Sequence, residues 1–428
     1  MRRFLIGSKH IERDSYIWNM LGSTVIAFQS VILLMILTRV GGLASSGTFT
    51  IAYTTANLML TVGKYGMHNF HVSDTAPIFS FGDYRASRWI TTLAMLALGV
   101  GYALLSIRGA EHSAEKTWVI VWMCVFKAVD AVEDVYAGLY QQSGRLDVSG
   151  KMIAVRGVLT VLFFSAVLLV GGGLLTALVL STVFTVALFL ILNGMASSVC
   201  RAQIKEKTDF KRVARLLWLC LPLFLIGFLS YYVTNAPKYA IDAMLDDTVQ
   251  ACYGFLAMPV FVVGLVGNYL FNPAIRPLSE HWQRGELGPF RRQIGRQSVT
   301  VLAITLICMA GAYLFGTPAL SLLYGTDLSA YRTELLVLVA SGGFLALANQ
   351  LLTVITILRR QTLLLIGYCP CALLAALLSF FAVRDYRIMG AAVLELGLTA
   401  LLCGVFGVIL VIEMRSAKTG FKEKGGTQ

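Results

Sequence analysis

The chain has 428 residues, of which 57% are apolar and only 14% charged, and its formal net charge is +12. A soluble domain carries about 25% charged residues, so no water-soluble fold of this length could hide so much apolar surface. In a basic nucleic-acid-binding protein the positive charge is clustered on a polar domain, whereas here most Lys and Arg residues lie between apolar runs. The composition therefore predicts an all-α integral membrane protein and excludes a nucleic-acid partner.

The first apolar run could belong to a signal peptide or to a first membrane span. Basic residues precede it, as they do in a signal peptide, but the run covers 17–38. This is longer than the apolar core of about 7–15 residues that a signal peptide has. No convincing small-residue cleavage site follows it. We therefore expect this run to stay in the protein as an uncleaved first span.

A transmembrane helix needs about 20 mostly apolar residues, and twelve runs meet this need. In chain order they cover residues 17–38, 43–62, 89–107, 118–138, 153–171, 174–195, 216–235, 251–271, 299–316, 333–357, 363–382 and 388–412. The most basic connection, 196–215, divides them six and six. This division predicts two six-helix bundles, 1–205 and 206–428, around a central cavity, as in many transporters.

The Lys and Arg residues of the connections predict the orientation in the membrane, because cytoplasmic loops carry an excess of them. Most of them lie in the two tails and in alternate connections. The opposite side carries Arg39, Arg108, Lys116, Lys238, Arg332, Arg384 and Arg387. We therefore expect a multi-pass protein with both termini in the cytoplasm. The connections on the opposite side are short, so no external domain is expected.

Motifs for ATP hydrolysis are absent from the sequence. Gly63-Lys64 and Gly150-Lys151 lack the spacing and the hydroxyl residue of a phosphate-binding loop. No metalloprotease or serine-hydrolase motif occurs either. We therefore expect no cofactor, and a transporter would use H⁺, Na⁺, the membrane potential or the gradient of its substrate.

Four ionisable residues occupy the span 118–138, namely Lys127, Asp130, Glu133 and Asp134. A charge at the centre of a bilayer costs about 2.5–3.5 kcal/mol, so it usually faces a partner or a cavity. Helical spacing places Lys127, Asp130 and Asp134 on one stripe. Two interpretations stay open: ion pairs that neutralise one another and steady the helix, or a substrate or proton site.

Three further places carry polar groups within apolar runs. The span 43–62 is rich in Ser and Thr, which indicates either tight helix packing or a wetted cavity wall. Asn349, Gln350 and Glu395 indicate interhelical hydrogen bonds or an ion site. Arg39 ends the first span. It either reaches the membrane interface or binds a phosphate, because its planar guanidinium donates two parallel hydrogen bonds.

Three local patterns follow one another along the chain. They are LTR at 37–39 with GTF at 47–49 and YGMHNFHVSD at 65–74, EDVYAG at 133–138 with RLD at 145–147, and NAPKYAID at 235–242 with CYG at 252–254. In this order they resemble the polysaccharide flippase family, within the superfamily of multidrug, oligosaccharidyl-lipid and polysaccharide exporters. His68 and His71 stand where that family often has Arg and Gln. A group that titrates near neutrality makes position 68 a poor permanent phosphate anchor.

The resemblance implies a flippase of the bacterial inner membrane. It would move undecaprenyl-pyrophosphate-linked oligosaccharide units from the cytoplasmic to the outer leaflet by alternating access, for surface polysaccharide (O-antigen or exopolysaccharide) biosynthesis. Implied partners are this substrate, membrane lipids, a polysaccharide polymerase and a chain-length regulator. The expected substrate-binding cations are Arg39, Lys127, Lys64, Lys238 and Arg276, and the expected coupling-ion carboxylates are Asp130, Asp134 and Glu395.

Rival functions differ in what the interior should contain. A cation-coupled multidrug antiporter of the same superfamily would have the same spans, but its cavity should favour acids and aromatic rings. A membrane glycan polymerase or ligase needs a place for catalytic groups, and no long outer loop offers one. A non-transporting scaffold would keep its function after its interior charges were neutralised.

Overall fold

The computed structural model describes residues 1–73, 78–106, 114–204, 206–260, 263–264, 271 and 275–425, and the side chains of these residues except 73, 276 and 417–425. Over these residues the protein is helical throughout and contains no strand. The all-α prediction is therefore confirmed. The chain forms two compact units, Met1–Phe228 (unit 1) and Leu229–Gln428 (unit 2). The predicted division at 205/206 lies before α9, the helix that passes from the first unit into the second, and the two-bundle division stays a prediction.

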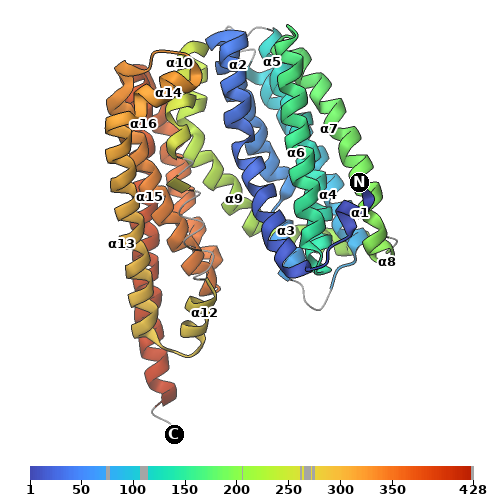
Figure 1. Cartoon of the computed structure of the whole chain (residues 1–428). Helices are drawn as coiled ribbons and strands as arrows, with labels where there is room; N and C mark the ends of the chain where they lie inside the picture. The colour runs from blue at the N-terminus through green and yellow to red at the C-terminus, as the bar shows by residue number, and fades with distance from the viewer. Residues whose placement is uncertain are drawn as a thin grey trace. The chain divides into compact units, whose positions relative to one another are not determined.

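Unit 1 is a bundle of membrane-length helices with short helices at one end (Figure 1). Its elements are α1 (Arg2–Ile6), α2 (Ile11–Lys64), α3 (Met67–Ser73), α4 (Phe81–Ser106), α5 (Ala114–Gln142), α6 (Leu146–Leu169), α7 (Leu174–Ala196), η1 (Ser197–Cys200), α8 (Arg201–Ile204) and the first part of α9 (Phe210–Met244). Helix α2 packs against α4, α5 and α6, and α5 also packs against α4 and α7. Helix α5 is therefore enclosed by neighbours on several sides.

The longest helix of unit 1, α2, is a hairpin of two spans. As a straight rod, its 54 residues would be about 80 Å long, far more than a hydrocarbon core of about 30 Å. The helix is interrupted at Gly42, whose backbone has φ 78° and ψ −178°. The hydroxyl of Ser46 donates a hydrogen bond to that of Thr38 over 2.9 Å, which is possible only if the chain reverses. The predicted spans 17–38 and 43–62 are the two arms.

Unit 2 contains the second long hairpin. Its elements are the end of α9, α10 (Asp247–Leu256), α12 (Ile275–Gln283), α13 (Leu287–Gly311), the π-helical turn η3 (Ala312–Gly316), α14 (Thr317–Tyr324), η4 (Ser329–Tyr331), α15 (Arg332–Ile357), η5 (Gln361–Leu363) and α16 (Leu364–Gly425). Helix α16 is interrupted at Arg387. Arg360, just before α16, pairs with Glu413 in its last third over 3.4 Å. The two arms of α16 therefore lie antiparallel.

The observed helices follow the predicted spans closely. Among the described residues, eight helices are long and apolar enough to cross a membrane. Each hairpin contains two predicted spans, and α5 covers 118–138 although its charges lower its hydropathy. The span 251–271 lies partly outside the described residues, as does the last residue of 89–107, and each of the other predicted spans overlaps described helix. The protein is a multi-pass membrane protein.

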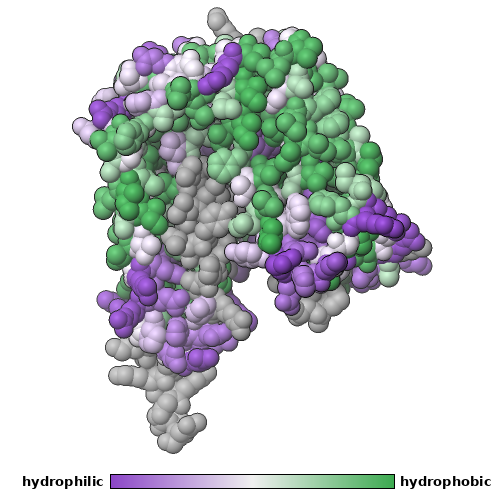
Figure 2. Space-filling model, viewed as in Figure 1, coloured by the Kyte–Doolittle hydropathy of each residue, from purple (hydrophilic) through white to green (hydrophobic). Residues whose placement is uncertain are grey.

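The outward faces of these helices are apolar. Large aliphatic and aromatic side chains are more than half exposed along both units, including Leu105, Leu162, Leu190, Ile307 and Phe381. Figure 2 shows this apolar surface as broad green areas, with hydrophilic residues gathered toward the ends of the helices. Such a surface is unsuited to water and matches lipid chains. The charged residues of the interior are therefore the unusual feature of the protein.

Candidate functional site

A network of ionised side chains fills the interior of unit 1 around α5. It consists of the carboxylates Asp130, Glu133 and Asp134 and the cations Lys64, Arg88, Lys127 and Arg156. We call these seven residues the α5 network. The carboxylates come from one helix, and the cations come from α2, α4, α5 and α6. The network therefore ties four helices together.

Arg156 makes the largest number of contacts in the network. Its Nη2 lies 2.6 Å from a carboxylate oxygen of Asp130 and 2.6 Å from one of Glu133. Its Nη1 donates to the hydroxyl of Thr185 on α7 over 3.1 Å. The ammonium of Lys127 donates to the other oxygen of Asp130 over 3.0 Å and lies 4.7 Å from the centroid of the Tyr53 ring, a cation–π contact.

The second half of the network surrounds Asp134. The guanidinium of Arg88 donates to Asp134 over 2.6 Å and to the backbone carbonyl of Gly63. The ammonium of Lys64 lies 3.4 Å from Asp134. The ring of His68 lies 3.7 Å from the same carboxylate and contacts Gln141 over 3.2 Å. Asp134 thus has one close, buried partner and two longer contacts.

The network is closed at its centre and open at one edge. The side chains of Lys127, Arg88 and Arg156 are 2–3% exposed, whereas that of Lys64 is 44% exposed. Removing two charges from water costs several kcal/mol per ion, and close pairing with satisfied hydrogen bonds is needed to offset it. The buried members are held in this way. Lys64 is the cation that combines contact with the network and access from outside.

Two members of the network were missing from the sequence prediction. Arg88 was placed in the connection before the run that begins at 89, and Arg156, close to the start of the run 153–171, was counted with the polar connection that precedes it. The helices themselves begin earlier, so that both arginines lie on helical turns inside the bundle. A signal was present: one lysine cannot neutralise three carboxylates on one span, so further cations had to come from neighbouring helices.

The other predicted cations lie in different surroundings. Arg39 is exposed beside the reversal of α2. The side chain of Arg276 lies outside the described residues. Lys238, on α9, donates a hydrogen bond to the side-chain oxygen of Asn235 over 2.9 Å. The roles predicted for these residues, and for the carboxylates, stay predictions.

A separate polar site in unit 2 surrounds Glu395. This carboxylate, on α16, is 5% exposed and accepts hydrogen bonds from the hydroxyls of Tyr253 on α10 over 2.6 Å and Ser341 on α15 over 3.2 Å. Lys238 lies within its electrostatic reach. Three helices thus meet at one carboxylate through neutral donors. Gln350 joins helices in a similar way, since it bonds to Ser298 and to a backbone carbonyl of α13.

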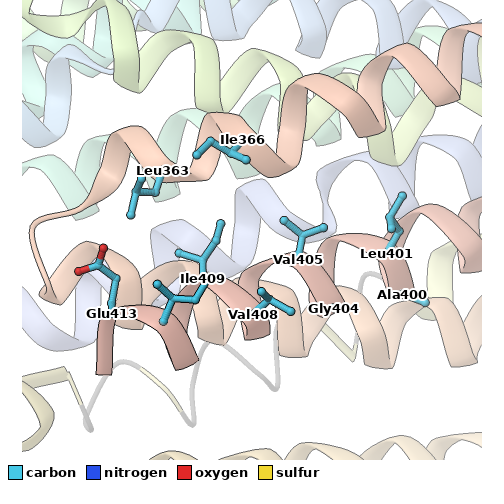
Figure 3. Close-up of a pocket in the computed structure, with 10 residues that line it drawn as sticks. Leu363, Ile366, Ala400, Leu401, Gly404, Val405, Val408, Ile409 and Glu413 are labelled. Carbon is cyan, nitrogen blue, oxygen red and sulfur yellow. The ribbon is translucent and has the colours of Figure 1, made fainter. Parts of the chain in front are cut away.

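An apolar groove of about 680 Å³ runs between the two arms of α16. Figure 3 shows its aliphatic walls, with the carboxylate of Glu413 at one end. It is lined by Leu363, Ile366, Ala400, Leu401, Gly404, Val405, Val408, Ile409, Ile412 and Glu413. Because Arg360 pairs with Glu413, a cation also marks that end. The groove has the shape and chemistry to hold a hydrocarbon chain.

Known structures with the same arrangement are membrane exporters. The sequence matches no protein-family model, and no curated protein matches it. An inward-facing multidrug resistance MATE family transporter of the MOP superfamily matches with a TM-score of 0.72 over 94% of this chain and 99% of its own, at 11% identity. The lipid II flippase MurJ, in an inward closed conformation, matches with a TM-score of 0.68 over 93% and 90%, at 14% identity.

A eukaryotic MATE transporter also matches, with a TM-score of 0.58 over 96% of this chain and 99% of its own, at 15% identity. At such low identity these matches define the fold alone. The protein therefore has the fold that these multidrug transporters and the lipid flippase share, in agreement with the predicted exporter fold.

Proposed function

We propose that the protein is a flippase for a lipid-linked oligosaccharide, and that its passenger carries a pyrophosphate between a polyprenyl chain and a sugar unit. One observation carries this proposal: the α5 network holds four permanent cations around three carboxylates, and one of these cations is accessible. A cationic excess inside a membrane protein favours an anionic passenger. The resemblance in the sequence points to undecaprenyl pyrophosphate as the carrier and to the outer leaflet of the inner membrane as its destination.

The physical need for such a network comes from the passenger's headgroup. Sugar hydroxyls and phosphates cannot cross hydrocarbon alone, since each unsatisfied polar group costs several kcal/mol there. Lys64 is suited to receive a phosphate. Its 3.4 Å contact with Asp134 is longer than the 2.6 Å bond that Arg88 makes to the same carboxylate. Lys64 can therefore leave Asp134 for a phosphate while Arg88 continues to neutralise that carboxylate.

The groove on α16 supports a lipid-bearing passenger over a free oligosaccharide. Its wall is aliphatic, so a polyprenyl chain that lies in it stays in surroundings as apolar as lipid. The chain would remain in apolar surroundings while the headgroup moves through the protein by alternating access.

The coupling ion in this proposal is a proton carried by Glu395. Asp130 and Asp134 each contact permanent cations, which favour their ionised forms. Glu395 accepts hydrogen bonds from two neutral hydroxyls instead, so a proton can join it without displacing an ion-pair partner bonded to it. Replacing Glu395 with Gln should abolish the dependence of transport on a pH gradient.

A second function, export of cationic drugs, is favoured by a different observation. Glu395 lies beside an aromatic residue, Tyr253, and a carboxylate with a π-face nearby is a typical receptor for an organic cation. The known MATE structures support this alternative as much as the MurJ structure supports the flippase. The two functions require passengers of opposite charge, so a single experiment separates them.

That experiment uses the purified full chain in proteoliposomes with two passengers, a fluorescent polyprenyl-diphosphate oligosaccharide and a cationic dye. The flippase proposal expects movement of the lipid only, and about a tenfold loss with Lys64→Ala, since a hydrogen bond to a charged group contributes about 1.5–3 kcal/mol. Lys211→Ala, which removes an exposed lysine elsewhere in unit 1, is the matched control. Movement of the dye alone would overturn the flippase and favour the antiporter.

A further inference from the structure

A second cavity lies on unit 2, where α12 and α13 pack together. Its volume is about 1000 Å³, larger than that of the α16 groove, and its lining is polar and cationic. It is lined by His281 of α12 and by Pro289, Arg292, Gln293, Arg296, Gln297 and Thr300 of α13. We call it the α13 pocket. It is distinct from the α5 network, which belongs to unit 1, and from the Glu395 site.

One face of α13 supplies most of the hydrogen-bond donors of this pocket. Arg292 and Arg296 are one helical turn apart, and Gln293 and Gln297 repeat that spacing beside them. Side chains four residues apart are neighbours on a helix surface. Each guanidinium offers five donors and no acceptor, and it binds a phosphate through two parallel hydrogen bonds. The pocket wall is therefore shaped for an anion with several oxygens.

Within the described part of the chain, the charge of this face has no carboxylate partner. Among the residues that the structure describes, neither Arg292 nor Arg296 has a carboxylate within ion-pairing distance, and the first turn of α13 contains no acidic residue. Glu286 precedes the helix, but it is engaged by His281 over 2.6 Å. Like charges one turn apart repel. An anion bound in the pocket would offset this repulsion.

The position of the pocket along α13 identifies where that anion comes from. Directly after the pocket the helix exposes a row of aliphatic side chains, Val299, Leu302, Leu306 and Ile307. Figure 2 shows hydrophilic residues gathered at this end of unit 2, next to apolar surface. The pocket thus lies where α13 passes from polar to lipid-facing surface, at the level of phospholipid headgroups. Basic pockets between helices at this level bind anionic lipid headgroups.

We propose that the α13 pocket binds the phosphate headgroup of an anionic phospholipid, whose chains lie along the exposed aliphatic face of α13. Arg292 and Arg296 hold the phosphate, and Gln293 and Gln297 donate to its remaining oxygens. The site is a lipid-binding site separate from the path of a transported molecule. It would hold unit 2 at a membrane surface that is rich in anionic lipid.

The test is lipid binding to the purified full chain in neutral detergent, followed by native mass spectrometry. Phosphatidylglycerol and phosphatidylcholine, both with short chains, are the two probes. We expect phosphatidylglycerol to bind in preference, and Arg292→Gln with Arg296→Gln to weaken its binding by about tenfold or more, because two charge-assisted hydrogen-bond sets are lost. Arg291→Gln is the matched control, since this exposed arginine is on the same turn but does not line the pocket.

Three results would overturn the proposal. If Arg291→Gln weakens the binding of phosphatidylglycerol equally, binding depends on overall surface charge and does not require the α13 pocket. Equal binding of the two lipids would mean that the headgroup charge is not recognised. Displacement of phosphatidylglycerol by inorganic phosphate at the same concentration would mean that the pocket takes a free anion. Melting curves without lipid show whether the double Gln variant is folded. If it is not, Arg292→Lys with Arg296→Lys is compared with the unchanged protein instead, because it keeps the charge and removes the planar guanidinium.

Discussion

The two units both bury ionisable groups among apolar helices, but they stabilise these groups in different ways. Unit 1 surrounds its carboxylates with arginines and lysines, so that each charge depends on its partners. Unit 2 holds Glu395 with the hydroxyls of Tyr253 and Ser341. Loss of one member of an interlocked ion network leaves an uncompensated charge, whereas neutral donors tolerate a change in the charge of the group they hold. The described charges of unit 1 are thus held by mutual pairing, and the carboxylate of unit 2 by neutral hydrogen-bond donors.

The largest effect on stability is expected at Arg156. Arg156→Ala leaves Asp130 and Glu133 buried with less than their full pairing, because this one side chain contacts both. Breaking a buried ion pair by removing one partner costs about 3–5 kcal/mol of folding free energy. Unfolding of the purified protein in mixed micelles measures this cost.

The control for this prediction is Arg212→Ala. Arg212 also belongs to unit 1 and pairs with Asp209 over 3.4 Å, but its side chain is 49% exposed. It also lies 3.8 Å from the buried carboxylate of Asp83, which keeps two backbone N–H donors, those of Ser80 and Asp209, without it. Exposed pairs contribute about 0–1 kcal/mol. If Arg156→Ala and Arg212→Ala unfold at the same denaturant concentration, the buried network does not support unit 1 in the way described here.

The next largest effect is expected at the reversal of α2. Gly42 has φ 78° and ψ −178°, a conformation open to glycine and disfavoured for residues with a Cβ. Nothing lies within 4 Å of a Cβ added there, so the cost of Gly42→Ala comes from the backbone alone. We expect a loss of about 1–3 kcal/mol in the free energy of unfolding.

Gly101→Ala is the matched control for the hairpin. Gly101 lies within α4 and also has nothing within 4 Å of an added Cβ, but its φ is not positive. Ala is the better helix former by about 0.8–1.0 kcal/mol, so this change should leave the protein unaffected or slightly more stable. If Gly101→Ala lowers the free energy of unfolding more than Gly42→Ala does, a side chain at position 42 does not strain the backbone of the reversal.

The fold was predictable from the sequence because hydropathy and chain length report directly on membrane spans. The reversal at Gly42 was placed between the spans 17–38 and 43–62, and α16 was resolved into 363–382 and 388–412. The one structural surprise in the spans is their length, since α4 begins at Phe81 and α6 at Leu146. Hydropathy finds the part of a helix that faces lipid, and it misses turns that carry charge into a bundle.

The site was predictable only in part, for the same reason. Lys127, Asp130 and Asp134 were found because they interrupt an apolar run. Arg88 and Arg156 were not found, because their partners come from other helices and pairing between helices is a property of packing. The neutral donors of Glu395 also come from two other helices. Sequence periodicity describes one helix at a time, so it identifies a buried charge without naming its partner.

A smaller effect is expected at the Glu395 site, and it sharpens the contrast between the units. Tyr253→Phe removes one hydrogen bond and leaves that of Ser341, so the free energy of unfolding should fall by about 1 kcal/mol. Glu395→Gln should change it no more than this, because the amide oxygen still accepts from one hydroxyl and the amide N–H can donate to the oxygen of the other. The same unfolding titration as for Arg156→Ala measures both. A loss from Glu395→Gln as large as that from Arg156→Ala would contradict the distinction between the two sites.

The last effect, a stabilising one, is expected at the reversal of α16. The chain reverses in this hairpin as it does in α2, but the interrupted position is occupied by Arg387, with φ 50° and ψ −128°. A residue with a side chain is strained there by about 1–3 kcal/mol, while the flexibility of glycine in the unfolded chain costs about 0.5–1 kcal/mol. Arg387→Gly should therefore raise the unfolding free energy by about 1 kcal/mol. Arg384→Gly, at an exposed helical position of the same hairpin, should lower it, because glycine weakens a helix. If both variants are destabilised equally, the two hairpins do not share one backbone rule, and the side chain of Arg387 must stabilise the turn of unit 2 directly.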